Sequence, residues 1–234
     1  MTGSSSSDAT TADRTSAAGT PATGADTGGS PTGPGAVLIL VRHGESTGNA
    51  DGLLLGRIDA PLTERGIGQA RSLADTVSGA TRLISSPLSR ARDTAEALGT
   101  GLPIEVDDRW IEVDYGEYDG QKLGDIPAAV WRRWRSDTAF VPPGGESLAA
   151  AGARVREACE ELFADPDGPA RGDGTVVVVS HVSPIKAATC WSLGIGDEGA
   201  WRLYLANASA TRISWGPGGP VLAGFNHTPW SAAQ

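Results

Sequence analysis

The sequence predicts an α/β domain of three layers, α/β/α, with helices on both faces of a mostly parallel central sheet. Two continuous apolar runs, AVLILV at 36–41 and GTVVVVS at 174–180, have the pattern of strands that are buried on both faces. Segments with helical spacing of apolar residues lie between the strand candidates. Strands that alternate with helices favour parallel pairing, because each helix returns the chain to the end of the sheet from which the strand started.

The first half of the domain contains two expected helices and a second strand. Thr63 is expected to cap a helix whose apolar positions extend to Val77. TRLISS at 81–86 is interpreted as the strand that follows. The next helix is expected to open at Pro87 and to end before Gly99, because proline fits the first helical turn and glycine fits the position past the last one.

The second half is expected to contain three more helices and three late strands that pair partly antiparallel. The expected helices are IPAAVWRRWRS at 126–136, GGESLAAAGARVREACEELF at 144–163 and PIKAATCWSLG at 184–194. The expected late strands are WRLYLA at 201–206, ATRISW at 210–215 and PVLAGF at 220–225.

Composition divides the chain into a tail at 1–35 and a domain at 36–234. The tail is almost entirely Ser, Thr, Gly, Ala and Pro, so we expect it to be disordered. The formal net charge of −9, from 28 acidic and 19 basic side chains, argues against nucleic acid or a membrane surface as a partner. The chain has no apolar run of membrane-spanning length and no basic-then-apolar leader, which favours a cytoplasmic location.

The cysteines and histidines indicate neither disulfides nor a metal. Cys159 and Cys190 lie in apolar helical segments without C-x-x-C spacing, so we expect buried thiols in a reducing compartment. The three histidines have no metal-ligand spacing, and no metal or other cofactor is expected; His227 is interpreted as structural or as part of a rim. The G-x-G-x-x-G match at 194–199 follows a helix and precedes a strand, the reverse of a dinucleotide site.

Basic side chains gather where the predicted strands end. His43 directly follows the first strand and His181 directly follows the strand at 174–180, the edge at which such sheets bind ligands. Arg42 and Arg90 would reach the same crevice, where the four side chains would repel each other unless an anion lay between them. Phosphate oxygens accept several charge-assisted hydrogen bonds, and Gly44 is expected to let the backbone approach such an anion. Each residue alone also fits chance or a hydrogen-bonded core group, and the joint placement favours the functional interpretation.

Six stretches of the sequence, in order, resemble the histidine phosphatase superfamily, which also contains the cofactor-dependent phosphoglycerate mutases. They are LVRHGESTGN, GRIDAPLTERGIGQA, SSPLSRARDTAEAL, WIEVDYGEYDG, PGGES and VVVVSHVSPIK. The resemblance implies a phosphoglycerate mutase-like fold. The SHVSPIK stretch is similar to the variant found in phosphatase domains fused to ribonuclease H in actinobacteria, which are akin to α-ribazole phosphatases and acid phosphatase domains.

The resemblance also implies catalytic roles. His43 matches the nucleophile that takes the phosphoryl group as phosphohistidine, within the Arg-His-Gly motif. Arg42, Arg90 and His181 match the residues that hold the phosphoryl oxygens. Glu112 matches the general acid, although its residue type and position alone do not distinguish it from the neighbouring carboxylates.

Other positions are implied to lie around the phosphate. Asn49 and Arg57 match positions near the phosphate and the substrate entrance. Val182 stands where relatives commonly have a glycine whose backbone N–H faces the phosphate, so the floor of the pocket should be tighter. Lys186 fits either a solvated surface lysine or a polar contact at the helix start, and the solvated lysine is slightly favoured. The tryptophans, such as Trp131, are expected to pack in the core or a lid rather than to line a substrate site.

These observations predict a metal-independent phosphomonoester hydrolase that acts on a small phosphorylated metabolite. One alternative is a cofactor-dependent phosphoglycerate mutase, which the compact span from Glu112 to His181 disfavours. Another is a non-catalytic module that binds phosphorylated ligands, which would have no use for a general acid. The segment 121–145 is expected to govern the choice of substrate, and the oligomeric state is left open, with a homodimer as one alternative.

Overall fold

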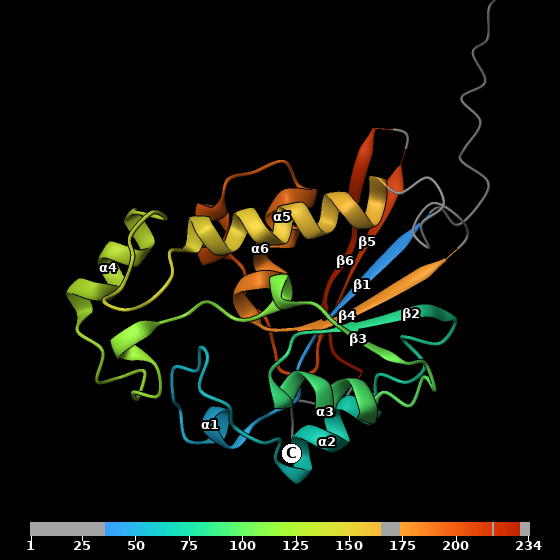
Figure 1. Ribbon diagram of the computed structural model, residues 1–234, viewed down its shortest axis with the longest axis horizontal. Helices are drawn as coiled ribbons and strands as arrows, with labels where there is room; N and C mark the ends of the chain where they lie inside the picture. Colours follow the sequence, from blue (N-terminus) through green and yellow to red (C-terminus); the bar gives the residue numbers. More distant parts are fainter. Residues whose placement is uncertain (1–35, 165–173, 217, 230–234) are drawn as a thin grey trace, which may run out of the picture. The chain divides into compact units, whose positions relative to one another are not determined.

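A six-stranded sheet forms the centre of the computed structural model, which describes residues 36–164, 174–216 and 218–229 (Figure 1). The strands are β1 (Val37–Arg42), β2 (Ala80–Ser85), β3 (Ile104–Val106), β4 (Thr175–Ser180), β5 (Ala210–Gly216) and β6 (Gly219–His227). Their order in the sheet is β3-β2-β4-β1-β5-β6. The first four strands pair in parallel, whereas β5 and β6 are antiparallel, so the mostly parallel sheet is confirmed. The tail predicted at 1–35 lies outside the described residues.

Helices and short 3-10 turns connect the strands. The α-helices are α1 (Thr47–Ala50), α2 (Glu64–Arg71), α3 (Ser89–Ala97), α4 (Ala128–Ser136), α5 (Leu148–Ala164) and α6 (Val182–Ser192). The 3-10 helices are η1 (Asp108–Trp110), η2 (Gly116–Tyr118) and η3 (Asp197–Arg202). Thr63 caps α2 as predicted, but the helix ends at Arg71 and turns carry the chain on to β2. Over the described ranges, no helix is long and apolar enough to cross a bilayer.

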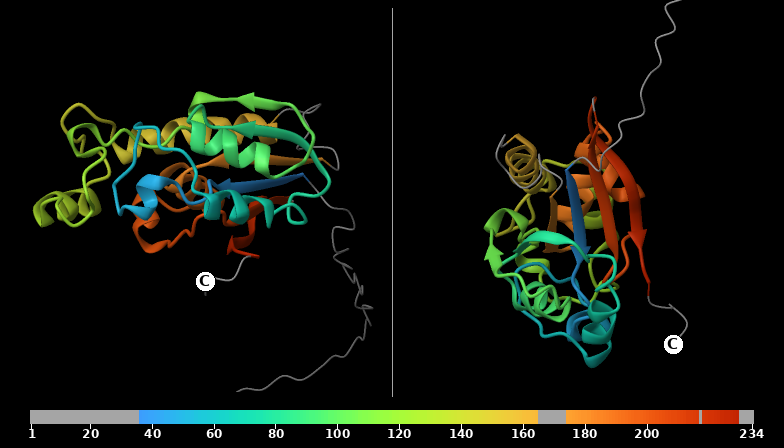
Figure 2. Two further views of the ribbon diagram at one scale, coloured as in Figure 1. Left: turned by 90° about the horizontal axis from the view of Figure 1, so that it is seen from below. Right: turned by 90° about the vertical axis from the view of Figure 1, so that its right-hand side faces the viewer.

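The alternating side chains of β1 supply both hydrophobic cores. Leu38 and Leu40 pack with apolar residues of α5 and α6 on one face of the sheet. Val37, Ile39 and Val41 pack with side chains of α3 and of the turns after α2 on the other face. Figure 2 shows these two helix layers on opposite sides of the strands, which confirms the three-layer prediction.

The two cysteines follow the same arrangement. Cys159 of α5 and Cys190 of α6 are both buried, and neither forms a disulfide. Burial in apolar surroundings raises the pKa of the Cys190 thiol to about 11 and that of the Cys159 thiol above its ordinary range. Both are therefore protonated core groups, as the sequence predicts.

The prediction of a strand at 201–206 is wrong. Its first residues belong to η3, and the rest form an irregular segment. Strand β5 already pairs with β1 on one side and β6 on the other, so it has no free edge for a further strand. The backbone of the segment instead serves side chains, because Leu205 O accepts from Arg42 at 2.7 Å and Ala206 N donates to Asn226 at 2.8 Å. Strand β3 was not predicted, because only three residues pair and none of them is fully buried.

Candidate active site

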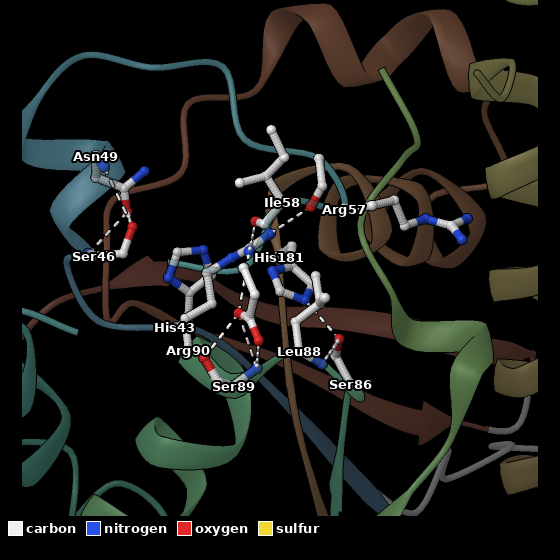
Figure 3. A network of polar contacts seen from close by, with 12 residues as sticks. His43, Ser46, Asn49, Arg57, Ile58, Ser86, Leu88, Ser89, Arg90 and His181 are labelled. Atoms are coloured by element: carbon white, nitrogen blue, oxygen red, sulfur yellow. Dashed lines mark hydrogen bonds and ion pairs between the residues drawn. The ribbon is translucent and has the colours of Figure 1, made fainter. Parts of the chain in front are cut away.

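The register of β1 and β4 places two histidines side by side. Arg42 pairs with Ser180 across the parallel strands, and the next residue of each chain segment is a histidine. His43 N donates to Ser180 O at 3.0 Å, so the two segments stay aligned past the end of the sheet. The ring centroids of His43 and His181 are 5.1 Å apart (Figure 3).

His43 is held in the tautomer that leaves Nε2 unprotonated. Its Nδ1 lies 2.7 Å from Gly44 O, and a carbonyl oxygen can only accept, so Nδ1 carries the hydrogen. The ring is buried. Burial, followed by the charges of Arg42 and Arg90, holds the pKa of His43 well below its usual range. A neutral imidazole with a lone pair on Nε2 is a competent nucleophile at neutral pH.

His181 has the opposite tautomer. Its Nε2 lies 2.7 Å from the hydroxyl of Ser86, which also accepts from Leu88 N at 3.4 Å. Within the described part of the chain this hydroxyl has no other acceptor, so its hydrogen is directed to Nε2 and Nδ1 carries the ring proton. Burial, together with the charge of Arg90, lowers the pKa of His181 well below its usual range. One histidine thus presents a lone pair and the other presents a hydrogen-bond donor.

The two arginines are fixed by backbone carbonyls. Arg90 is fully buried, and its guanidinium donates to Gly56 O at 2.7 Å and to Ile58 O at 2.8 Å. Arg42 donates to Leu205 O at 2.7 Å. Burial lowers the pKa of Arg42 to about 10, so the group stays charged at neutral pH. Main-chain carbonyls therefore hold both cations in place, and Arg90 also forms an ion pair with Asp59 at 3.9 Å.

Three buried nitrogen atoms at this edge of the sheet have no hydrogen-bond partner. They are Nε of Arg42, Nε of Arg90 and Nδ1 of His181; over the described residues, the other buried side-chain atom in this state is Trp110 Nε1. A buried donor that lacks a partner costs about 1–3 kcal/mol, and an acceptor anion would remove that cost. The site is therefore arranged for an anion with several oxygen atoms.

A cavity of about 220 Å³ opens beside these groups. It is lined by Arg42, His43, Asn49, Leu53, Leu54, Leu55, Glu112, Tyr115, Leu123 and Val182. Over the described ranges, no three His, Cys, Asp or Glu side chains are grouped so as to hold a metal ion. The cavity joins residues that are far apart in the sequence, from the end of β1 to the start of α6.

Glu112 brings a carboxylate to this cavity. Among the described residues it is the one acidic side chain that is buried, with 3% of its surface exposed. The carboxylate accepts from Val113 N at 2.7 Å and from Ser183 N, in the first turn of α6, at 3.3 Å. The N-terminal end of a helix favours a negative charge. The sequence signal that marks Glu112 is its place between Trp110 and Val113, two buried residues that anchor this part of the acidic loop in the core.

Of the remaining predicted positions, two line the cavity and one does not. Asn49 lines the cavity; its Oδ1 accepts from Ser46 and Asn207, which leaves the amide N–H groups for a ligand. Val182 also lines the cavity, at the start of α6. Arg57 does not line it: the side chain extends away from His43 in Figure 3, with Nε on Glu112 O at 3.2 Å and Nη2 on Glu146 at 3.4 Å. Arg57 therefore braces the backbone of Glu112.

Sequence reasoning missed Asp119, which organises the loop that holds Arg90. Its carboxylate accepts from three consecutive backbone groups, Gly56 N and Arg57 N at 2.7 Å and Ile58 N at 2.9 Å. The carbonyls of Gly56 and Ile58 are the acceptors for Arg90. Asp119 thus fixes Arg90 through the backbone, a contact that no spacing in the sequence indicates.

Gly44 has a different role from the one expected. Its N–H donates to Thr94 Oγ1 at 3.0 Å and so is not turned toward an anion. A Cβ at this position would collide with the backbone of Gly66 in α2. The glycine is needed because the strand end and the helix approach each other closely.

Comparisons with known proteins agree with this geometry. The sequence profile of the histidine phosphatase superfamily (branch 1) matches residues 38–228. A bifunctional protein of Mycobacterium tuberculosis is 35% identical over 180 residues, which are 74% of this chain and 48% of that protein, so the chain spans about half the length of this relative. Phosphoserine phosphatase 1 of Hydrogenobacter thermophilus is 37% identical over 184 residues, 75% of this chain and 85% of that protein. The structure of a mycobacterial glucosyl-3-phosphoglycerate phosphatase complexed with VO3 has a TM-score of 0.74 and 32% identity, over 82% of this chain and 100% of that one.

Proposed function

This chain belongs to the histidine phosphatase superfamily, and we propose that it hydrolyses a phosphate monoester of a small metabolite through a phosphohistidine on His43. The observation that carries the proposal is the meeting of unlike groups at one edge of the sheet. A neutral imidazole with a free lone pair lies beside three unpartnered buried nitrogens from Arg42, Arg90 and His181. Relatives that are named phosphatases support the same activity.

The first step transfers the phosphoryl group to His43. The lone pair of Nε2 attacks phosphorus while the bond from phosphorus to the ester oxygen breaks. Glu112 in its protonated form gives its proton to the departing oxygen. Arg42, Arg90 and His181 hold the non-bridging oxygens, on which negative charge is spread in the transition state.

The second step returns the enzyme to its starting state. Glu112, now a carboxylate, takes a proton from a water molecule that attacks the phosphorus. The bond between phosphorus and Nε2 breaks, inorganic phosphate leaves, and His43 is again neutral with Nε2 free. Dividing the displacement into two steps lowers the barrier, because the imidazole attacks the ester more readily than water does and then leaves readily when water attacks phosphorus.

The test is phosphate release from a panel of metabolite monophosphates with EDTA present. We expect release from one or a few compounds, unchanged by EDTA and reduced by ~10⁴-fold in His43→Ala, since removal of a nucleophile leaves only binding and electrostatic contributions. His227→Ala is the matched control, because this histidine is exposed and lies outside the catalytic cavity. Normal activity in His43→Ala would exclude the mechanism, and strong EDTA inhibition would exclude a metal-free reaction.

The net charge and the free thiols support a proposal about the location and partners of the protein. We propose a cytoplasmic enzyme that binds neither nucleic acid nor membrane, because its net charge is −9 and both cysteines are free. Cell fractionation tests the location, and recovery of the protein with the membrane fraction would contradict it. A homodimer stays an open alternative that sedimentation of the purified protein decides.

A further inference from the structure

A second cavity shares a wall with the catalytic cavity. It encloses about 120 Å³ and is lined by Leu54, Tyr115, Trp131, Leu148, Val182, Ser183, Lys186, Ala200 and Trp201. Leu54, Tyr115 and Val182 line both cavities. Apart from Leu54 and Tyr115, its lining comes from α4, α5, α6 and η3.

The general acid stands at the boundary between the two cavities. Glu112 lines the first cavity, and its carboxylate accepts from Ser183 N, while Ser183 lines the second cavity. The hydroxyl of Ser183 lies 3.1 Å from the Tyr115 hydroxyl, which extends the same wall. A general acid must reach the oxygen of the leaving group. A leaving group that meets Glu112 therefore lies next to the second cavity.

Lys186 is the charged group of the second cavity. It is half-buried, not solvated as the sequence suggested, and among the described residues its ammonium has no hydrogen bond or ion pair. Burial lowers the pKa of Lys186, while the charge of Glu112 raises it and that of Arg42 lowers it. A cation removed from water is usually paired with an anion. No side chain of the described residues supplies that anion.

The walls around Lys186 are aromatic. Trp131 of α4 and Trp201 of η3 lie 6.5 Å apart between ring centroids, with their planes at 87°. With Tyr115 they form a surface that favours a flat apolar group. The cavity, with a volume of about 120 Å³, has room for one ring.

Lys186 has no ion pair among the described residues, whereas Arg90 has one with Asp59 at 3.9 Å. A negative charge on the leaving group would give Lys186, in the second cavity, the partner that it lacks. Complementary charge of this kind selects between ligands of similar shape.

We propose that the second cavity binds the leaving group, and that it selects a flat apolar body carrying one carboxylate, which pairs with Lys186. The inference rests on the proposed phosphatase function and adds the class of substrate to it.

The experiment compares two synthetic substrates, one with a charged and one with an uncharged para substituent. They are para-carboxyphenyl phosphate and its methyl ester, assayed by phosphate release with wild type, Lys186→Met, Lys186→Arg and the control Lys122→Met. Lys122 is the other lysine of the sequence and is exposed. We expect wild type and Lys122→Met to prefer the carboxylate in kcat/KM. In Lys186→Met, kcat/KM for the carboxylate substrate alone should fall by roughly 10- to 100-fold, which is the effect of losing a hydrogen bond to a charged group. Lys186→Arg keeps the positive charge and should keep most of the preference.

Other outcomes overturn the inference in distinct ways. An equal loss on both substrates in Lys186→Met would show that the lysine acts through Glu112, and a shifted pH profile of kcat would accompany it. No loss on either substrate would show that Lys186 does not contact the leaving group. Hydrolysis of the metabolite panel without hydrolysis of the aryl pair overturns this inference and leaves the phosphatase function standing. Failure of every phosphomonoester overturns the function itself.

Discussion

The edge of the sheet that carries His43 and His181 and the aromatic wall of the second cavity are supported in different ways. At the edge, His43 and His181 follow buried central strands, and the arginines are bonded to main-chain carbonyls. The wall rests on a separate apolar cluster in which Leu54, Ile126 and Trp134 are buried and further aromatic side chains pack around them. In Figure 1, α4, which carries much of this cluster, lies away from the sheet.

Under the proposed function, this difference separates the groups that perform the reaction from the groups that select the substrate. Groups that must not move relative to one another are attached to the sheet, whose core contains most of the buried apolar surface. Groups that meet the variable part of a substrate are attached to a smaller cluster. A change in the wall can therefore alter the choice of substrate while the nucleophile and the phosphate-binding groups stay in place.

The largest expected difference is in the stability effects of replacing two tryptophans. Trp110 is fully buried in the sheet core, and Trp110→Ala should lower the free energy of unfolding by about 3–5 kcal/mol. Trp134 is equally buried, but in the smaller cluster, so Trp134→Ala should mainly loosen the segment around α4. Urea denaturation measures the first effect, and hydrogen exchange of residues 126–140 measures the second. Equal global destabilisation by both variants would show that the two regions unfold as one unit.

A smaller effect is expected from Asp119, which supports the phosphate-binding edge from outside the cavity. Asp119→Ala should free the loop at 56–58 and release Arg90 from its two carbonyls. We expect kcat/KM to fall by roughly 10- to 100-fold, as it does when the residues that orient a functional side chain are removed. Binding of inorganic phosphate should weaken in parallel, measured by inhibition.

Two controls separate positioning from folding. Asp119→Asn keeps one acceptor oxygen and should retain part of the activity. Asp125→Asn, at an exposed carboxylate of the same segment, should behave as wild type. A loss of stability in Asp119→Ala with unchanged phosphate inhibition would remove the positioning role.

The smallest expected effect is a pH dependence of stability. Unfolded histidines bind protons near pH 6.5, whereas buried His43 and His181 bind them only at lower pH. The unfolded state thus holds more protons below pH 6.5, so stability falls as pH drops through this window, by up to about 1.4 kcal/mol per pH unit for each histidine. Urea midpoints between pH 5.5 and 7.5 should show the slope, and His43→Gln should reduce it. An identical slope in the variant would contradict a buried neutral His43.

Much of the fold and part of the site are predictable from the sequence. β1 and β4 are continuous apolar runs, and a residue that directly follows such a run must lie at the edge of the sheet, which identifies His43 and His181. The irregular segment at 203–206 has the apolar composition of a strand, but pairing partners are a property of the whole sheet. Local patterns therefore could not exclude it.

The rest of the site depends on contacts between distant segments. Glu112 stands among other carboxylates and was identified only through the family resemblance. Asp119 acts through backbone N–H groups some sixty residues earlier in the chain, which leave no mark in the sequence. Lys186 looked solvated because Trp131 and Trp201, which enclose it, come from other elements.

The central claim is a covalent phosphohistidine on His43, and trapping tests it most directly. Glu112→Gln is mixed with para-nitrophenyl phosphate, whose leaving group departs without a general acid, and the intact protein is weighed by mass spectrometry at alkaline pH. Because the variant lacks the base for attack by water, one phosphoryl group should accumulate on His43, and none should accumulate in the double variant with His43→Ala. Release of nitrophenol without any phosphoprotein, or a phosphoryl group on another residue, would contradict the account.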